Sequence, residues 1–136
     1  PFEYDGQVLR GTCVSMGNPH CVFFVDDVWQ VELEKIGPVL ENHPIFPKRA
    51  NIEFVAVKSR DSIDMRIWER GSGITLASGT GSSASVTATI LNGKADKGTP
   101  ITVNLPGGTL VVEWKEDGHI WQTGPAVEIC TGVFYL

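Results

Sequence analysis

The stretch that decides the fold is SGTGSSASVTATIL, residues 78–91, in which no residue carries a charge. A helix on a protein surface presents a polar or charged face, so a helix without one is normally buried on all sides. Glycines form a turn before this stretch, and Asn92-Gly93 ends it with a typical helix stop. We therefore predict one central, buried helix over Gly81–Leu91, whose small side chains let strands approach closely.

Short apolar runs separated by turn residues surround this helix in the sequence and predict strands. His20–Val25 is expected to be buried on both faces, and Glu116-Asp117-Gly118 predicts a hairpin. A short amphipathic helix, interrupted by Gly37-Pro38, is expected over Val31–Asn42. The other expected strands are Gln7–Val14, Asn51–Val57, Ser62–Glu69, Thr99–Leu105, Leu110–Trp114, His119–Thr123 and Ala126–Leu136.

The composition indicates a single domain over residues 1–136. Of these residues 42% are hydrophobic, and 15 Gly with 8 Pro suit many tight turns. The predicted fold is α+β: a curved, mostly antiparallel sheet or barrel wrapped around the central helix. A net charge of −5 argues against nucleic acid and an anionic membrane as partners, and no apolar run is long enough to span a bilayer.

The cysteines and histidines exclude two other classes of protein. Three cysteines without CxxC spacing are not a disulfide framework, which favours a reducing, cytoplasmic location. No spacing of His, Cys and carboxylates supports a zinc or iron site.

Glu69 is the first candidate site residue. Side chains alternate along a strand, so Glu69 shares the core face with Met65 and Ile67. A buried carboxylate needs partners or a raised pKa. The alternative is that the strand ends at Trp68 and that Glu69 is solvated.

The turn before the uncharged helix is the second candidate. Glycines around Ser78 expose backbone N–H groups, and the helix dipole favours a carboxylate or phosphate beside them. A plain N-cap by Ser78 or Thr80 is the alternative. The turn is not a P-loop, because no Gly-Lys-Ser/Thr follows, and it lacks the glycines of a nucleophile elbow.

His20 is the third candidate, because it follows Gly17-Asn18-Pro19 at the mouth of a buried strand. An imidazole there can act as a base or orient another group. A purely structural hydrogen bond is the alternative.

Together these motifs resemble, in their order along the chain, those of the diaminopimelate epimerase family. The resemblance covers nearly the whole chain but only the C-terminal half of such an enzyme, since the half with an Asn-x-Cys-Gly-Asn-Gly motif is absent. No Met precedes Pro1, so we expect a piece of a longer protein. The matching stretches are Gly17–Val22, Gly37-Pro38, Glu41–Pro47, Asn51–Phe54, Arg66–Gly71, Gly79–Gly81, Leu105–Gly108 and Thr123–Ala126.

The resemblance implies a cytoplasmic isomerase that interconverts L,L- and meso-diaminopimelate for lysine and peptidoglycan precursor synthesis. In that family one cysteine thiolate removes the α-proton and a second cysteine returns one from the opposite side, without pyridoxal phosphate, another cofactor or a metal. The expected partners are diaminopimelate, the missing N-terminal half and a second copy in a homodimer.

The chain departs from the family at a catalytic position, because the second cysteine falls on Ser78. A serine hydroxyl has no accessible anion at neutral pH and cannot replace a thiolate as the base, so this half-chain alone is expected to be inactive. An engineered Cys→Ser change and a natural loss both fit the sequence. Ile74 also stands where the family usually has Glu.

The resemblance implies roles for eight residues. His20 would pair with the cysteine of the N-terminal half, and Glu69 with the group at position 78. Arg70 is suited to binding a carboxylate through two hydrogen bonds. All eight except His20 are expected to meet at one end of the sheet. The substrate-binding set is Asn18, Asn51, Glu69, Arg70, Gly79 and Thr80.

Two other functions stay open at this stage. Another isomerase or racemase of the same fold is one, although the Asn-Pro-His and Trp-Glu-Arg-Gly stretches argue against it. A non-catalytic amino-acid-binding domain is the other, and Ser78 and the absent half favour it.

Overall fold

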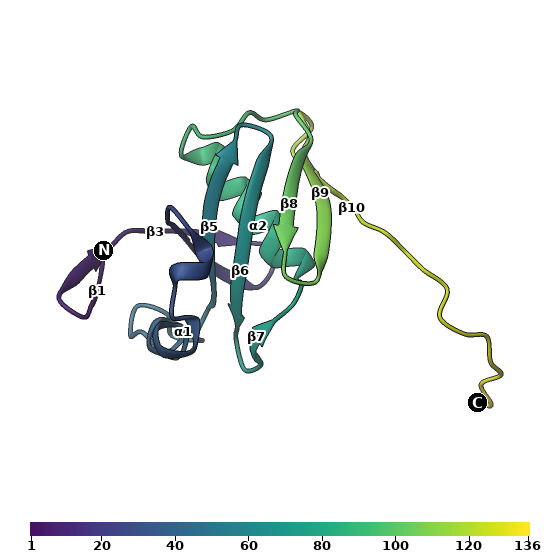
Figure 1. Cartoon of the computed structure of the whole chain (residues 1–136), viewed down its shortest axis with the longest axis horizontal. Coiled ribbons are helices and arrows are strands. Elements are labelled where there is room, and N and C mark those ends of the chain that lie inside the picture. The colour runs from purple at the N-terminus through teal and green to yellow at the C-terminus, as the bar shows by residue number, and fades with distance from the viewer.

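The computed structural model describes residues 1–136 as a curled main sheet with a helix on each face, and a separate two-stranded sheet near the N-terminus (Figure 1). The helices are α1 (Leu33–Glu41) and α2 (Gly79–Leu91), with a 3-10 turn at Val28–Gln30. The strands are β1 (Phe2–Tyr4), β2 (Gln7–Leu9), β3 (Gly11–Ser15), β4 (Pro19–Phe24), β5 (Asn51–Ser59), β6 (Ser62–Glu69), β7 (Gly73–Thr75), β8 (Ile101–Leu105), β9 (Gly108–Trp114) and β10 (Ile120–Thr123).

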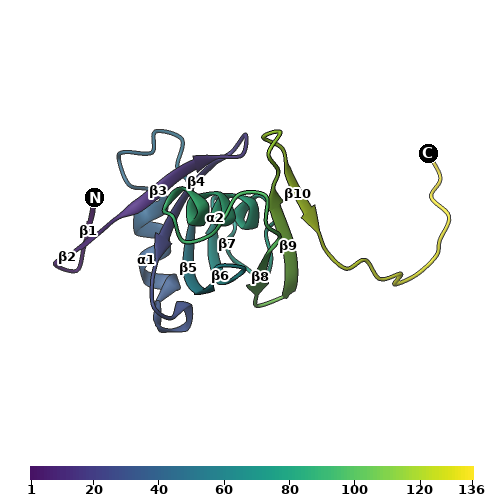
Figure 2. The same ribbon diagram turned by 90° about the horizontal axis from the view of Figure 1, so that it is seen from above.

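The main sheet runs in the order β10-β9-β8-β6-β5-β4-β3, with β7 paired to β6 off this path. Adjacent strands in this sheet are antiparallel, except that β4 is parallel to β5 and β6 is parallel to β8. The two end strands do not pair with each other, so the sheet is an open half-barrel curled around α2 (Figure 2). This confirms the predicted α+β class and mostly antiparallel sheet, which stays open instead of closing into a barrel.

The central helix is buried as predicted. Ala84, Val86 and Ala88 pack against the concave face of the sheet in one hydrophobic core. The helix can be uncharged and still polar because its hydroxyls bond inside the helix: Thr89 Oγ1 donates to the carbonyl oxygen of Ser85 at 2.7 Å. The sequence of α2 therefore suits a helix that is buried along its middle and exposed only at its ends.

The convex face of the sheet carries a second core under α1. Leu33 and Leu40 pack with Phe23 and Phe54 there. Pro38 lies inside this helix without ending it. A Cβ on Gly37 would come within 2.5 Å of the Trp68 ring, so glycine lets α1 approach β6 closely.

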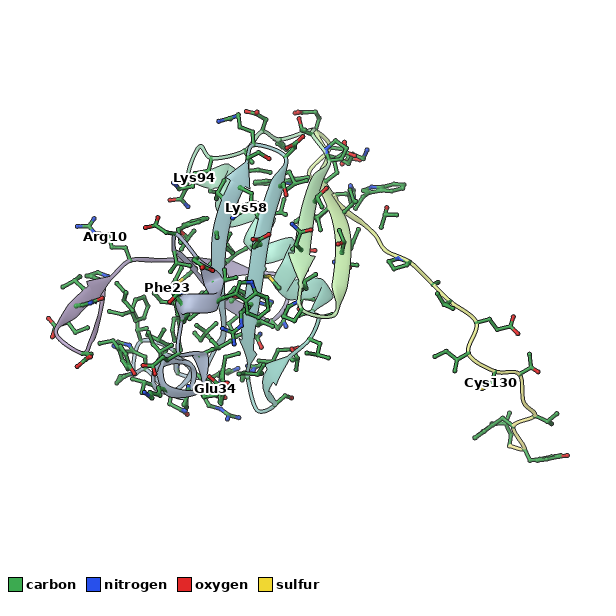
Figure 3. All side chains as sticks on the ribbon, viewed as in Figure 1. Arg10, Phe23, Glu34, Lys58, Lys94 and Cys130 are labelled. Atoms are coloured by element: carbon green, nitrogen blue, oxygen red, sulfur yellow. The ribbon has the colours of Figure 1, made fainter.

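Three expectations about the strands need correction. The strand predicted over Ala126–Leu136 is wrong, because this segment forms no helix or strand and extends away from the sheet, as Cys130 in Figure 3 shows. Alternating apolar residues make a strand only where another strand offers hydrogen bonds, and none lies beside this segment. The Gln7–Val14 run is split at Arg10, and the hairpin of β1 and β2 was not predicted. Neither helix is long and apolar enough to cross a membrane.

Candidate active site

One face of the sheet gathers most of the candidate side chains. Residues paired across neighbouring strands share a face, and the pairs His20↔Asn51 and Glu53↔Ile67 join three strands. Ile67 packs in the concave core beside α2, so its pair partner Glu53 also faces the helix. The alternation of side chains places Asn51, two residues from Glu53, and Glu69, two residues from Ile67, on this same face.

The start of α2 carries backbone N–H groups that have no acceptor within the chain. Ser78 is the N-cap, and its Oγ accepts a hydrogen bond from the Gly81 N–H at 3.1 Å. The N–H groups of Gly79 and Thr80 have no acceptor within the chain. The N-cap alternative is therefore confirmed for Ser78, and two N–H groups at the positive end of the helix remain unbonded within the chain, as the anion-binding hypothesis requires.

The turn lies close to the sheet, and the glycine at position 81 allows this close approach. A Cβ on Gly81 would lie 2.7 Å from Ile67 Cδ1 and 3.0 Å from Ser78 Oγ. Ser78 and the β6 face that ends in Glu69 thus lie on the same side of the helix start. Gln122, which the sequence did not single out, holds the turn by donating to the carbonyl oxygen of Gly79 at 3.0 Å.

Glu69 belongs to β6, so the alternative in which the strand ends at Trp68 is wrong. The Glu69 side chain accepts a hydrogen bond from Thr75 Oγ1 across the β6–β7 pair. The residue is half-buried. Its carboxylate is therefore oriented by a hydroxyl and still open on one side.

Asn51 fixes the backbone around this carboxylate. Its Oδ1 accepts from the Arg70 N–H at 2.9 Å, and its Nδ2 donates to the carbonyl oxygen of Pro19 at 3.0 Å. The Arg70 guanidinium makes one hydrogen bond, to the carbonyl oxygen of Lys48 at 3.0 Å. Its remaining donors are free for a ligand.

Glu41, which the sequence analysis did not select as a site residue, supports the following turn from α1. Its Oε1 accepts from the Gly71 N–H at 2.9 Å, and its Oε2 accepts from Trp68 Nε1 at 2.7 Å. The partly exposed Arg49 forms an ion pair with the buried Glu41 carboxylate at 3.0 Å. The loop that carries Arg70 is thus anchored to α1 as well as to the sheet.

His20 is fully buried and lies between two polar partners. Its Nε2 is 3.1 Å from Asn18 Oδ1, and its Nδ1 is 2.5 Å from Glu53 Oε1. Burial raises the pKa of Glu53 to about 7, although the neighbouring His20 acts in the opposite direction. The negative charge of Glu69 adds to the increase of this pKa.

Asn18 connects His20 to the helix start, because its Nδ2 donates to Thr80 Oγ1 at 3.3 Å. The predicted residues fall into two groups, of which hydrogen bonds connect only the first as a chain. That chain runs from Glu53, which was not predicted, through His20 and Asn18 to Thr80. In the second group only Asn51 and Arg70 are joined by a hydrogen bond, and its members are Asn51, Glu69, Arg70, Ser78 and Gly79.

The cysteines lie outside this site. Cys21 is buried on the convex side, with its Sγ 3.9 Å from Cys13 Sγ. Burial is the main cause that raises the pKa of the Cys21 thiol. The structure agrees with the expectation that Cys21 is buried and cannot replace the base missing at position 78.

Comparison with known proteins adds the family to this geometry. A family model described as diaminopimelate epimerase matches residues 12–129. The diaminopimelate epimerase of Bacillus pumilus is 49% identical over 136 residues, which are 100% of this chain and 48% of that protein. Diaminopimelate epimerase 1 of Nostoc sp. is 56% identical over 133 residues, 97% of this chain and 47% of its own length. The chain thus spans about half the length of the curated relatives it matches.

Solved structures support the fold independently. A phenazine biosynthesis protein of the PhzF family from Bacillus anthracis aligns with a TM-score of 0.56 at 19% identity, over 84% of this chain and 38% of that one. A PhzC/PhzF protein from Clostridium difficile aligns with a TM-score of 0.54 at 17% identity, over 79% and 39%. At these identities the likeness concerns the fold alone.

Proposed function

This chain belongs to the diaminopimelate epimerase family, and from that premise we propose that it supplies one half of a two-sided active site for amino-acid epimerisation. The substrate is diaminopimelate, interconverted between its L,L and meso forms without pyridoxal phosphate or metal, in cytoplasmic lysine and peptidoglycan precursor synthesis. One observation carries the proposal. The start of α2, with its free N–H groups, lies on the concave side of the sheet, and Glu69 and the buried His20 belong to this same side.

The chemical problem is the weak acidity of the α-proton. We assign the substrate α-carboxylate to the N–H groups of Gly79 and Thr80, where the helix dipole stabilises the negative charge that develops as the proton leaves. One thiolate takes the proton, and the carbanion accepts a proton from a thiol on its opposite face. Position 78 stands beside this carboxylate site, where a helix start favours the thiolate of a cysteine.

We assign the two groups of residues to opposite sides of the α-carbon. Glu69 serves the group at position 78, and His20 serves the cysteine of the N-terminal half. Asn18, Asn51 and Arg70 hold the polar groups of the substrate. A homodimer of the full-length enzyme is a further part of this proposal.

Ser78 breaks the scheme on one side. Its hydroxyl caps the helix as a cysteine thiol could, but it has no accessible anion at neutral pH. We therefore propose that the chain as it stands has the shape of its half of the site and lacks the base that belongs to this half.

The test uses the full-length protein, in which this segment is joined to an N-terminal half like that of its relatives. With Ser78→Cys, L,L-diaminopimelate should convert to the meso form, and the Ser78 protein should not convert it. Substrate binding without conversion by the Ser78→Cys protein would favour the amino-acid-binding alternative. Conversion of a different amino acid alone would favour another racemase of the same fold.

A further inference from the structure

Glu53 is the most unusual charged group of this molecule. It lies on β5, it is fully buried, and its Oε2 has no hydrogen-bond partner. Removing a carboxylate from water costs several kcal/mol unless partners replace the water. The only side chain that bonds to it is His20, through Oε1 at 2.5 Å. The stability of the fold gives no reason for a carboxyl group in this place.

We propose that Glu53 is a positioning residue for His20, which it holds in one ring orientation and one protonation pattern facing the catalytic cleft. This inference rests on the proposed function, because it gives His20 its task beside the cysteine of the other half. The parallel register of β4 and β5, in which Val22 pairs with Glu53, puts the carboxyl group next to the imidazole.

The hydrogen bonds fix the number of protons on the pair. Asn18 Nδ2 donates to Thr80, so Asn18 Oδ1 faces His20 Nε2 and can only accept. Nε2 therefore carries a proton, and a second proton lies between Nδ1 and Glu53 Oε1. The pair is neutral overall whether it is an imidazolium with a carboxylate or an imidazole with a carboxylic acid.

A neutral pair with a fixed Nε2–H suits a group that works beside a thiol. The ring cannot turn, because both nitrogens are engaged, and it always presents the same N–H to Asn18, which bonds to Thr80 at the start of α2. Burial raises the pKa of Glu53 to about 7, so this carboxyl group holds a proton more readily than an exposed one. Glu53 thus adjusts the charge of His20 without touching the substrate.

The first experiment observes the shared proton directly. In the full-length protein with labelled histidines, the proton spectrum should show a strongly downfield resonance from the proton shared between His20 Nδ1 and the Glu53 carboxyl group. His20→Gln assigns this resonance by removing it, and Glu53→Gln should remove it while the rest of the spectrum stays folded. If the unaltered protein lacks this resonance, the proposal is wrong, and that result does not depend on any variant folding.

The second experiment separates positioning from structure. In the catalytically competent Ser78→Cys protein, Glu53→Gln should lower kcat roughly tenfold to a hundredfold, as loss of a supporting group does, and leave KM within about twofold. Glu34→Gln, an exposed change on α1, is the matched control. An unchanged kcat in folded Glu53→Gln would overturn the proposal. An inactive Ser78→Cys protein would refute the proposed function, and the proton spectrum would still decide the role of Glu53.

Discussion

Two carboxyl groups stand on the same face of the same sheet, and their surroundings differ. Glu53, in the middle of the sheet, is fully buried and bonds to an imidazole. Glu69, at the end of β6, is half-buried and bonds to the hydroxyl of Thr75. They lie on the neighbouring strands β5 and β6, so their difference in burial comes from their positions along these strands.

The comparison shows how one curled sheet can hold two carboxyl groups in different surroundings, which the proposed mechanism assigns to opposite sides of the substrate. The Glu53 carboxyl group acts on a ring and is protected from water, so its influence on the cleft is indirect. The Glu69 carboxylate lies at the end of β6 and bonds to Thr75, and we propose that it serves the group at position 78 directly. Separate changes to the two groups should therefore have different kinds of effect.

The largest difference is expected in catalysis. In the Ser78→Cys full-length protein, Glu69→Gln should lower kcat by about 10² to 10⁴, the usual contribution of a positioned acid or base. The Glu69 effect should exceed that of Glu53→Gln measured under the same conditions. Equal effects of the two changes would remove the distinction between a group at the cleft and a group behind it.

The next difference concerns stability. His20→Ala leaves Glu53 buried without its partner and should lower the free energy of unfolding by about 3 kcal/mol. Glu69→Ala removes a half-buried carboxylate and should cost about 1 kcal/mol or less. Urea unfolding of both variants of the chain measures the difference, and a similar cost for both would contradict the contrast in burial.

The pH dependence of stability should isolate Glu53. Its pKa is raised from 4.5 to about 7 in the folded protein, mainly by burial, so the folded state binds this proton more tightly than the unfolded chain. The contribution of this group to the free energy of unfolding is therefore greatest at low pH and falls, by roughly 1 to 3 kcal/mol, as pH rises from about 4.5 to 7.

Urea unfolding at about pH 5 and about pH 7.5 measures this slope. Glu53→Gln should flatten it, and Glu69→Gln should leave most of it in place. A slope that survives Glu53→Gln would mean that another group carries the pH dependence.

The smallest effect concerns thiol reactivity at the Glu69 end. In Ser78→Cys, the new thiol lies at a helix start, which favours the thiolate, whereas burial raises the pKa of Cys21. Alkylation should be at least about tenfold faster at position 78, a difference of about 1.4 kcal/mol. Peptide mass spectrometry of a timed iodoacetamide reaction measures both rates, and faster labelling of Cys21 would contradict the assignment of the anion site.

The sequence predicted the parts of the fold that depend on local pattern. The uncharged run of α2 and the hairpin at Glu116-Asp117-Gly118 could be predicted because their signals lie within a few residues. The tail 126–136 could not, since its alternating pattern says nothing about whether a partner strand exists. The β1–β2 hairpin consists of three-residue strands, which are too short for a periodicity.

The site could be predicted in part for the same reason. Glu69 and the turn at Ser78 are local features, and alternation was enough to place the carboxylate on the core face. Glu53 lies 33 residues from His20, and only the parallel register of β4 with β5 brings them together. Parallel pairing across a long connection leaves no local mark in the sequence, so the residue that positions His20 was missed.

The most direct test of the account is proton–deuterium exchange at the α-carbon of L,L-diaminopimelate in deuterated water, followed by NMR. The central claim is that this chain is one half of a two-sided site and that Ser78 replaces the base of this half. The 136-residue chain with Ser78 should therefore leave the α-proton signal at its background rate, while the full-length Ser78→Cys protein, as the positive control, exchanges it. Clear exchange by the 136-residue chain alone would contradict the two-sided mechanism.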